Sequence, residues 1–298
     1  MCSITPQIDI AFKKIFGTEE NKDLLISLIN AIVSPEDQVS DLTLKNPYSY
    51  QNYIDNKLSI FDIKAQSKRG EEYNIEMQLK DDDQYEKRAL YYWARLYSDQ
   101  LTKGKNYQTL KKSIGIHLLN FTCLSDVKKY HNVFQMRERD SHKHYFKDIE
   151  IHIIELNKFS DQEEENVNNL IQKIKNSLDI WLAFLTRHNL LDQTHLPAPL
   201  DTPYMQKALH TLSCLNFNKE ERDIYEGRLK WLRHESLVLE QSFEKGMEKG
   251  MEKGRQEGME KEKITIAKNM LSLGLSKRKI AQATGLSMVV IEQLDRDS

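Results

Sequence analysis

Three polar residues could meet on one face of a β-sheet: Asp62, Glu76 and Gln78. They lie in the segments 57–66 and 71–80, and both segments alternate polar and apolar residues with the period of two that is typical of β-strands. Two carboxylates that face each other repel, and a cation between them relieves that repulsion. Mg²⁺ binds one or two carboxylates together with water and phosphate oxygens. The pattern therefore indicates a site for a hard divalent cation.

The turn between the two segments sets their register. A three-residue loop at 68–70, with Gly70 in the left-handed conformation, would place Asp62 directly opposite Glu76. In such a pair the two Cβ atoms lie about 4.5–5.5 Å apart. Because side chains alternate between the faces of a strand, Gln78 shares the face of Glu76. The predicted hairpin therefore gathers both acids and the amide on one wall of the sheet.

The same spacing allows a simpler interpretation, in which this face is open to water. Lys64 and Lys80 would then neutralise the acids, and on spacing alone this is the more common case. The opposite face of the second strand is apolar and is expected in the core; it comprises Tyr73, Ile75, Met77 and Leu79.

The other periodicities predict an α/β fold, a mixed central β-sheet flanked by helices and followed by an all-helical C-terminal region. The additional strands are expected at 41–46, 113–121 and 149–156. Helices are expected at 9–33, with a break at Gly17, and at 84–104, 162–187, 203–216 and from 219 onward, the last 35 residues forming three short helices at 263–273, 276–283 and 287–294.

The composition excludes several classes of protein. The chain has 298 residues, and 43 Lys+Arg against 45 Asp+Glu give a formal net charge of -2, which argues against an acidic or basic tail protein. No segment is apolar over the roughly 18 to 20 residues that a membrane span needs, so we expect a soluble cytoplasmic protein with no membrane partner. The widely spaced Cys2, Cys123 and Cys214 indicate neither disulfides nor structural zinc. His117 and His152 lie in apolar strands and are interpreted as structural.

Several segments around the acidic pair resemble one family of nucleases. An Asp followed on the next strand by Glu-x-Gln is a loose form of the signature of the PD-(D/E)XK nuclease superfamily. The Rpn-type family of recombination-promoting nucleases, often labelled transposases, is similar in the stretches DIAFKKIFG (9–17), LLISLINAI (24–32), FDIKA (61–65), NIEMQ (74–78), YEKRALYYWARLY (85–97) and GKNYQTL (104–110). The likeness covers more than half of the chain. It implies a restriction-endonuclease-like core and a metal-dependent DNA endonuclease linked to recombination, mobile elements or genome defence.

The resemblance also implies a role for each site residue. Asp62 and Glu76, with the Met77 carbonyl, would bind Mg²⁺ or Mn²⁺, which polarises the scissile phosphate and activates water. Gln78 stands where many members of the superfamily carry lysine. It would orient the water or a phosphoryl oxygen, because an amide does not act as a base. Asp9 opens the first predicted helix, and we interpret it as the N-cap in preference to a supporting metal ligand.

The predicted helix at 84–104 carries a stripe of groups that could contact DNA phosphates. Tyr85, Arg88, Tyr92 and Arg95 recur at intervals of three and four, which places them along one side of the helix. Since this helix follows the hairpin, the stripe would flank the acidic pair. The competing interpretation is an amphipathic helix with an ordinary charged outer face.

The C-terminal region contains one internal repeat, EKGMEKGMEKGRQEGMEK at 244–261. Its period of four aligns four glycines along a helix: Gly246, Gly250, Gly254 and Gly258. A close helix-to-helix contact between two copies would explain them, and a flexible linker or repeat slippage in the gene is the competing interpretation. The final segment resembles the helix-turn-helix of site-specific recombinases, with an N-cap at Ser287. The apolar Met288 and Val289 that follow suit a protein contact at least as well as base recognition.

We expect four segments along the chain. They are a PD-(D/E)XK nuclease-like core at 1–160, a helical accessory region at 161–240, a glycine-repeat helix or linker at 241–262, and a small helix-turn-helix-like module at 263–298. The expected partner is double-stranded DNA, and we expect a homo-oligomer that forms through the C-terminal region. The competing hypotheses are a DNA-binding or self-associating protein with a vestigial nuclease site, and an RNA nuclease.

Overall fold

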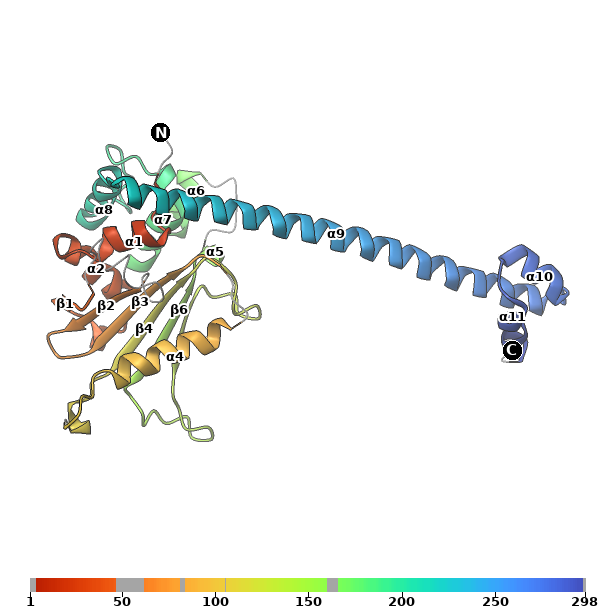
Figure 1. The fold of residues 1–298 in the computed structure, drawn as a ribbon, viewed down its shortest axis with the longest axis horizontal. Helices are drawn as coiled ribbons and strands as arrows, with labels where there is room; N and C mark the ends of the chain where they lie inside the picture. The colour runs from red at the N-terminus through yellow and green to blue at the C-terminus, as the bar shows by residue number, and fades with distance from the viewer. Residues whose placement is uncertain (1–3, 47–61, 81–83, 105, 160–165, 297–298) are drawn as a thin grey trace. The chain divides into compact units, whose positions relative to one another are not determined.

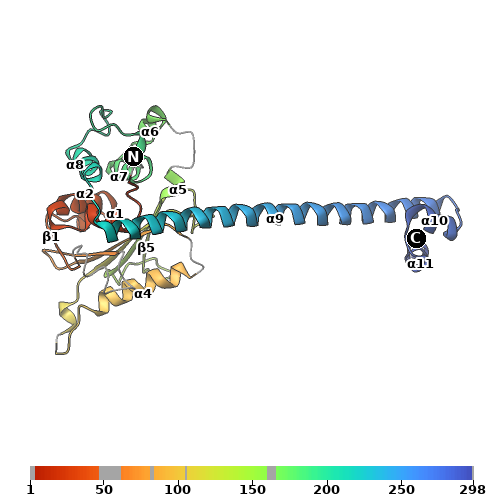
Figure 2. The same cartoon turned by 45° about the horizontal axis from the view of Figure 1, so that its top comes forward.

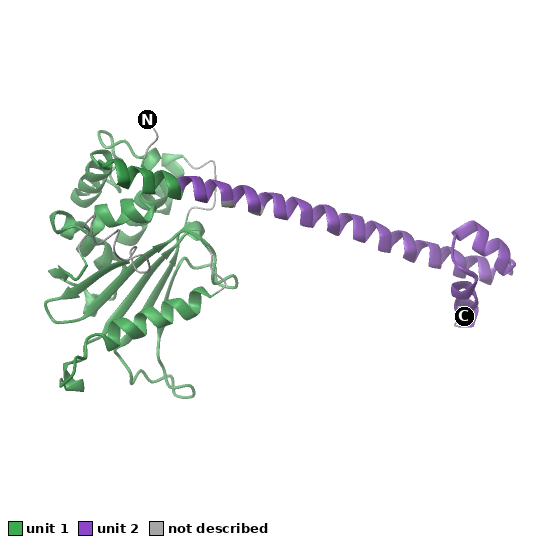
Figure 3. Ribbon diagram, in the orientation of Figure 1, with its two compact units in different colours: residues 1–228 green, residues 229–298 purple. Residues whose placement is uncertain are grey.

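The computed structural model describes residues 4–46, 62–80, 84–104, 106–159 and 166–296. These divide into two compact units, residues 1–228 and residues 229–298 (Figure 3). Each unit is described by itself below. The described part of the chain contains no helix that is both long enough and apolar enough to cross a membrane.

The first unit is built on a mixed six-stranded sheet in the order β1-β2-β3-β4-β6-β5 (Figure 1). Its strands are β1 Leu42–Leu44, β2 Asp62–Ser67, β3 Glu72–Gln78, β4 Ser113–Leu119, β5 His131–Gln135 and β6 Ile149–Glu155. β3, β4 and β6 run parallel to one another, and the remaining neighbours pair antiparallel. The predicted α/β class with a mixed sheet is confirmed.

Helices cover both faces of this sheet (Figure 2). One face packs into the main apolar core against α1 Asp9–Phe16, α2 Lys22–Ile32, α7 Ser177–Arg187 and α8 Pro203–Ser213. The other face packs against α4 Tyr85–Ser98 in a smaller apolar cluster. Short helices complete the unit: α5 Leu156–Phe159, α6 Val167–Lys173, and the 3-10 turns Glu19–Asn21, Pro35–Asp37, Tyr107–Thr109 and His188–Leu190. Apolar side chains on alternate strand positions therefore have helical partners on both sides.

Several predicted boundaries were wrong for identifiable reasons. The helix expected at 84–104 ends at Ser98, because the Gln100 side chain then bonds the backbone of Lys111 through both its oxygen and its amide nitrogen. The helix expected at 162–187 is divided, since Asn176 and Asp179 form a capping box that starts α7 afresh. Residues 57–61 and 162–165 of two predicted elements lie outside the described residues.

The edge strand β5 was not predicted at all. Its residues are half-buried or exposed, with Val133 43% and Phe134 44% exposed, so no alternation of polar and apolar residues marks it. It forms through backbone pairing with β6. An edge strand of this kind has no sequence signal of the type that betrays a half-buried strand.

The second unit contains most of α9 Lys219–Ser272, followed by α10 Lys277–Thr284 and α11 Met288–Arg296. The separate helix predicted from residue 263 was wrong, because α9 continues through the glycine repeat to Ser272. Ser287 accepts a hydrogen bond from the Val290 backbone, as expected of an N-cap. Ala267, Ile280 and Ile291 form the small apolar core of the three helices.

The glycine repeat is helical and open on its glycine side. A Cβ atom added at each of the four glycines would meet nothing within 4 Å among the described residues; these are Gly246, Gly250, Gly254 and Gly258. Contacts within the described chain therefore do not explain why the repeat uses glycine.

Candidate active site

The hairpin of β2 and β3 has the predicted register. Asp62 pairs directly with Glu76, and the backbone nitrogen of Ser67 donates to the carbonyl of Glu71 over 2.9 Å. Gly70 has a φ of +96°, the left-handed conformation that the three-residue loop requires. The two acids are therefore opposite each other on neighbouring strands.

Both acids are buried, so this face of the sheet is not the open, wet surface of the simpler interpretation. Asp62 and Glu76 are each 8% exposed. Lys64 is one of the two cations that this interpretation named, and its Nζ lies 3.9 Å from Asp62 Oδ2. A pair of carboxyl groups withdrawn from water needs compensating positive charge.

Asp62 lies among charges that act in opposite directions. Burial raises the pKa of Asp62, and the negative charge of Glu76 raises it further. The positive charges of Lys64 and Lys13 lower it, but the net effect is an increase. Lys13 is itself buried on α1, and burial lowers its pKa against the attraction of Asp62. Lys13 was not among the predicted site residues, although a lysine within the apolar stretch DIAFKKIF is the kind of signal that marks a functional charge.

One carboxylate oxygen of Glu76 is paired with a cationic side chain, and the other lacks a hydrogen bond among the described residues. Nη2 of Arg88 lies 3.1 Å from Oε1 of Glu76. Nδ1 of His117 lies 3.5 Å from Oε2, which is too long for a well-formed hydrogen bond, and neither of these two atoms has a hydrogen-bond partner among the described residues. Burial alone would raise the pKa of Glu76, but His117 and Arg88 outweigh it, so the pKa is lowered. Glu76 is therefore held as a carboxylate whose Oε2 lacks a well-formed hydrogen bond among the described residues.

His117 was expected to be a structural residue and is indeed buried at 1% exposure. It nevertheless lies against the acidic pair, because parallel pairing of β3 with β4 places it opposite Glu76. Nothing local to its own strand indicated this neighbour.

The stripe predicted on α4 divides between the interior and the surface. Tyr85 is buried, with its ring edge-on to those of His117 and Phe121, so its burial removes it from the groups available to DNA and corrects that prediction. Tyr92 is half-buried and Arg95 is exposed. Because α4 packs its Tyr85 side on the sheet, only part of the stripe remains accessible.

Asp9 was expected to cap its helix, and this was wrong. Ile8 is the N-cap, and Asp9 occupies the first turn of α1. Its Oδ2 accepts a hydrogen bond from Nε of Arg228 over 2.9 Å, while its Oδ1 accepts one from the Ile10 backbone. Burial raises the pKa of Asp9 and Arg228 opposes the increase. The carboxylate is thus engaged by Arg228, and a role as supporting metal ligand would require that pairing to break.

The other two predicted residues lie on β3 beside Glu76. Gln78 is half-buried, and its Nε2 donates to the carbonyl of Lys80 over 3.3 Å. The Met77 side chain points into the core on the opposite face, as the alternation requires, which leaves only its backbone carbonyl as a ligand.

This donor set fits a divalent cation that keeps open positions. Two facing carboxylates, with one buried oxygen of Glu76 that has no hydrogen bond among the described residues, match the one or two carboxylates by which Mg²⁺ is commonly bound. Among the residues that the structure describes, no group of three or more His, Cys, Asp or Glu side chains is arranged to hold a metal ion. The arrangement therefore suits an ion completed by water and phosphate, and not a closed structural site.

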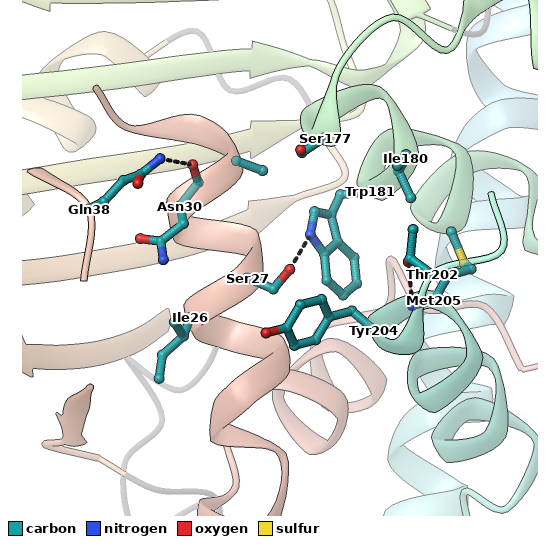
Figure 4. Close-up of a pocket in the computed structure, with 11 residues that line it drawn as sticks. Ile26, Ser27, Asn30, Gln38, Ser177, Ile180, Trp181, Thr202, Tyr204 and Met205 are labelled. Carbon is teal, nitrogen blue, oxygen red and sulfur yellow. Dashed lines mark hydrogen bonds between the residues drawn. The ribbon is translucent and has the colours of Figure 1, made fainter. Parts of the chain in front are cut away.

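A cavity of about 280 Å³ in the same unit has no part in this arrangement (Figure 4). Residues of α2, α7 and α8 line much of it, with Trp181 donating from its ring nitrogen to Ser27. The side chains that line it are Ile26, Ser27, Asn30, Ala31, Gln38, Ser177, Ile180, Trp181, Thr202, Tyr204 and Met205. It shares no residue with the acidic pair.

Comparison with known proteins identifies the family. A family model described as PD-(D/E)XK nuclease family transposase matches residues 6–242, which include the hairpin, α4 and the whole sheet. No curated protein and no solved structure matched the chain. The match spans most of the 298 residues and agrees with the mixed sheet flanked by helices. The chain therefore belongs to the PD-(D/E)XK nuclease family transposases, and its α/β fold is of the restriction-endonuclease-like kind.

Proposed function

We propose that this protein is a divalent-metal-dependent endonuclease that hydrolyses phosphodiester bonds of double-stranded DNA, in a process linked to recombination or mobile elements. Membership of the nuclease family supports hydrolysis of nucleic acid. The observation that carries the proposal is the buried, facing pair of Asp62 and Glu76, in which Oε2 of Glu76 has no hydrogen-bond partner among the described residues.

The predicted residues of the hairpin each have a part in this proposal. Asp62, Glu76 and the Met77 carbonyl would hold Mg²⁺ or Mn²⁺. The bound ion supplies Lewis-acid polarisation of the scissile phosphate and a water of lowered pKa. Gln78 orients the attacking water or a phosphoryl oxygen through its amide, which does not titrate. The two carboxylates repel phosphate groups. DNA is therefore expected to approach where positive charge offsets this repulsion.

The surface beside the pair is the proposed DNA contact. Arg88, Tyr92 and Arg95 lie on α4, which covers the same sheet face as Glu76. Guanidinium and phenol groups are frequent donors to phosphate oxygens.

The self-association expected through the C-terminal region stays a prediction, which light scattering on the full chain would test.

Nicking of supercoiled plasmid DNA with added Mg²⁺ or Mn²⁺ tests the proposal. We expect Asp62→Asn and Glu76→Gln each to lower cleavage about a thousandfold. Glu72→Gln is the matched control, since Glu72 lies on the same strand and face, equally buried, but receives a hydrogen bond from Gln66 of β2. Undiminished cleavage by both site variants would place the chemistry elsewhere. DNA binding without cleavage by any preparation would favour a vestigial site, and faster cleavage of RNA would favour an RNA nuclease.

A further inference from the structure

Arg88 occupies the carboxylate that the proposed ion needs. Its Nη2 lies 3.1 Å from Oε1 of Glu76, while Oε2 of Glu76 faces His117. Both oxygens of this acid therefore already point at protein groups that can carry positive charge. A divalent cation that binds Glu76 must share or replace these neighbours.

The geometry makes Arg88 the neighbour that can leave. Its side chain is 31% exposed, whereas that of His117 is 1% exposed and fixed within β4. A guanidinium stays protonated at every relevant pH, so it cannot relieve its repulsion from a divalent cation by losing a proton. At a few ångströms that repulsion is strong, and the long arginine side chain can relieve it by rotating toward solvent.

We infer that Arg88 and the divalent cation compete for Glu76, and that Arg88 is a positioning residue that holds this carboxylate in the ion-free protein and is released toward DNA phosphate when the ion binds. This inference rests on the proposed function. It explains how the protein keeps two facing acids buried without an ion, because Arg88 then supplies the positive charge beside Glu76. It also links occupation of the metal site to an increase in positive charge at the DNA-contacting surface.

Calorimetric titration of the full-length protein with Mn²⁺ tests the competition directly. We expect Arg88→Gln to bind Mn²⁺ about fivefold more tightly than the wild type, which is the size of effect expected on losing one partly exposed ion pair. Arg88→Lys should give an intermediate affinity. Lys87→Gln is the matched control, because it removes the same charge from the neighbouring exposed position of α4 and should change the affinity by less than about twofold. Equal or weaker Mn²⁺ binding by Arg88→Gln would overturn the inference.

Cleavage provides a readout of opposite sign. At saturating Mn²⁺ we expect Arg88→Gln to cut plasmid DNA about tenfold more slowly despite its tighter ion binding, with partial rescue by Arg88→Lys. A purely structural role would weaken ion binding and cleavage together. Faster cleavage by Arg88→Gln would show that the released arginine does not serve DNA and would overturn that part of the inference.

A Glu76→Gln background separates this inference from the proposed function. There, Arg88→Gln should leave the residual Mn²⁺ affinity unchanged, because the shared carboxylate is gone. If the wild type binds and cuts as proposed but Arg88→Gln behaves like it, only the competition is refuted. If the wild type binds no Mn²⁺, the proposed function and the inference are refuted together.

Discussion

Two buried acid clusters on one sheet differ in how completely their acceptors are satisfied. Glu150 on β6 receives hydrogen bonds from Lys112 over 3.1 Å, from Gln135 over 2.7 Å and from His152 over 2.9 Å. Lys112 also bonds Asp37. Burial alone would raise the pKa of Glu150, but His152, Gln135 and Lys112 lower it to about 2. This cluster is complete without a ligand.

The carboxylate oxygens of the pair on β2 and β3 are less completely satisfied by hydrogen bonds. Burial raises the pKa of Asp62, and Nζ of Lys64 lies 3.9 Å from its Oδ2. Glu76 keeps one buried oxygen without a hydrogen bond among the described residues. Since a buried acceptor without a hydrogen bond costs about 1–3 kcal/mol, this oxygen is the atom at which we propose that the ion binds. The difference teaches that satisfaction, and not burial or charge alone, separates a structural cluster from a candidate site.

The largest expected effect is on activity and comes from Asp62→Asn. We expect cleavage to fall about a thousandfold, the scale seen when an electrostatic contribution to catalysis is removed. The free energy of unfolding should stay constant or increase at neutral pH. The folded-state pKa of Asp62 is raised, so ionisation of this group costs stability as the pH rises above its ordinary value, and the amide avoids that cost. Plasmid nicking and urea unfolding measure the two quantities, and a loss of both would contradict the comparison.

The opposite result is expected at the complete cluster. Glu150→Gln should lower the free energy of unfolding by about 3 kcal/mol, because it leaves His152 without its buried anion and Lys112 with only Asp37. Cleavage per folded molecule should not change, since Glu150 belongs to neither the acidic pair nor α4. Urea unfolding and nicking at a temperature where both proteins are folded provide the measurements. A stable variant that no longer cuts would mean that the two clusters are coupled.

The pH dependence of stability sharpens the contrast. The folded-state pKa of Glu150 is lowered to about 2 from an ordinary value of 4.5, so its contribution is fully present above about pH 4.5. That contribution is lost as the pH falls toward 2. The difference in unfolding free energy between the wild type and Glu150→Gln should therefore be constant near neutrality and shrink below about pH 4.5. A difference that grows on acidification would contradict a lowered pKa for Glu150 in the folded protein.

The smallest expected effect concerns Lys13. Its charge lowers the pKa of Asp62, so Lys13→Met should raise that pKa and move the acid limb of the pH–rate profile for cleavage to higher pH. We expect stability to change by less than about 1 kcal/mol, because the loss of attraction to Asp62 is offset by removal of a buried charge. Lys14→Met is the control, since Lys14 bonds Glu221 and the Asn216 carbonyl instead. An unshifted acid limb would show that the charge of Lys13 does not influence the ionisation of Asp62.

Local patterns in the sequence determined the hairpin and much of the fold. Alternation identified β2 and β3, β4 and β6 were predicted as further buried strands, and Gly70 set the turn that brings Asp62 opposite Glu76. These features follow from the pleat and from backbone sterics, which act over a few residues. The same kind of reasoning could not find β5, which is held by pairing with β6, or the end of α4, where Gln100 bonds a distant backbone.

Only the tertiary structure decided what surrounds the acids. Arg88, His117 and Lys13 come from α4, β4 and α1, and their arrangement depends on strand order and helix packing over long sequence separations. Burial divided the stripe on α4 into an inward Tyr85 and an outward Arg95, which spacing alone treats alike. The sequence thus determined which two carboxylates meet, because their meeting is a matter of local register. Which charges each carboxylate would face depended on the packing of the whole first unit.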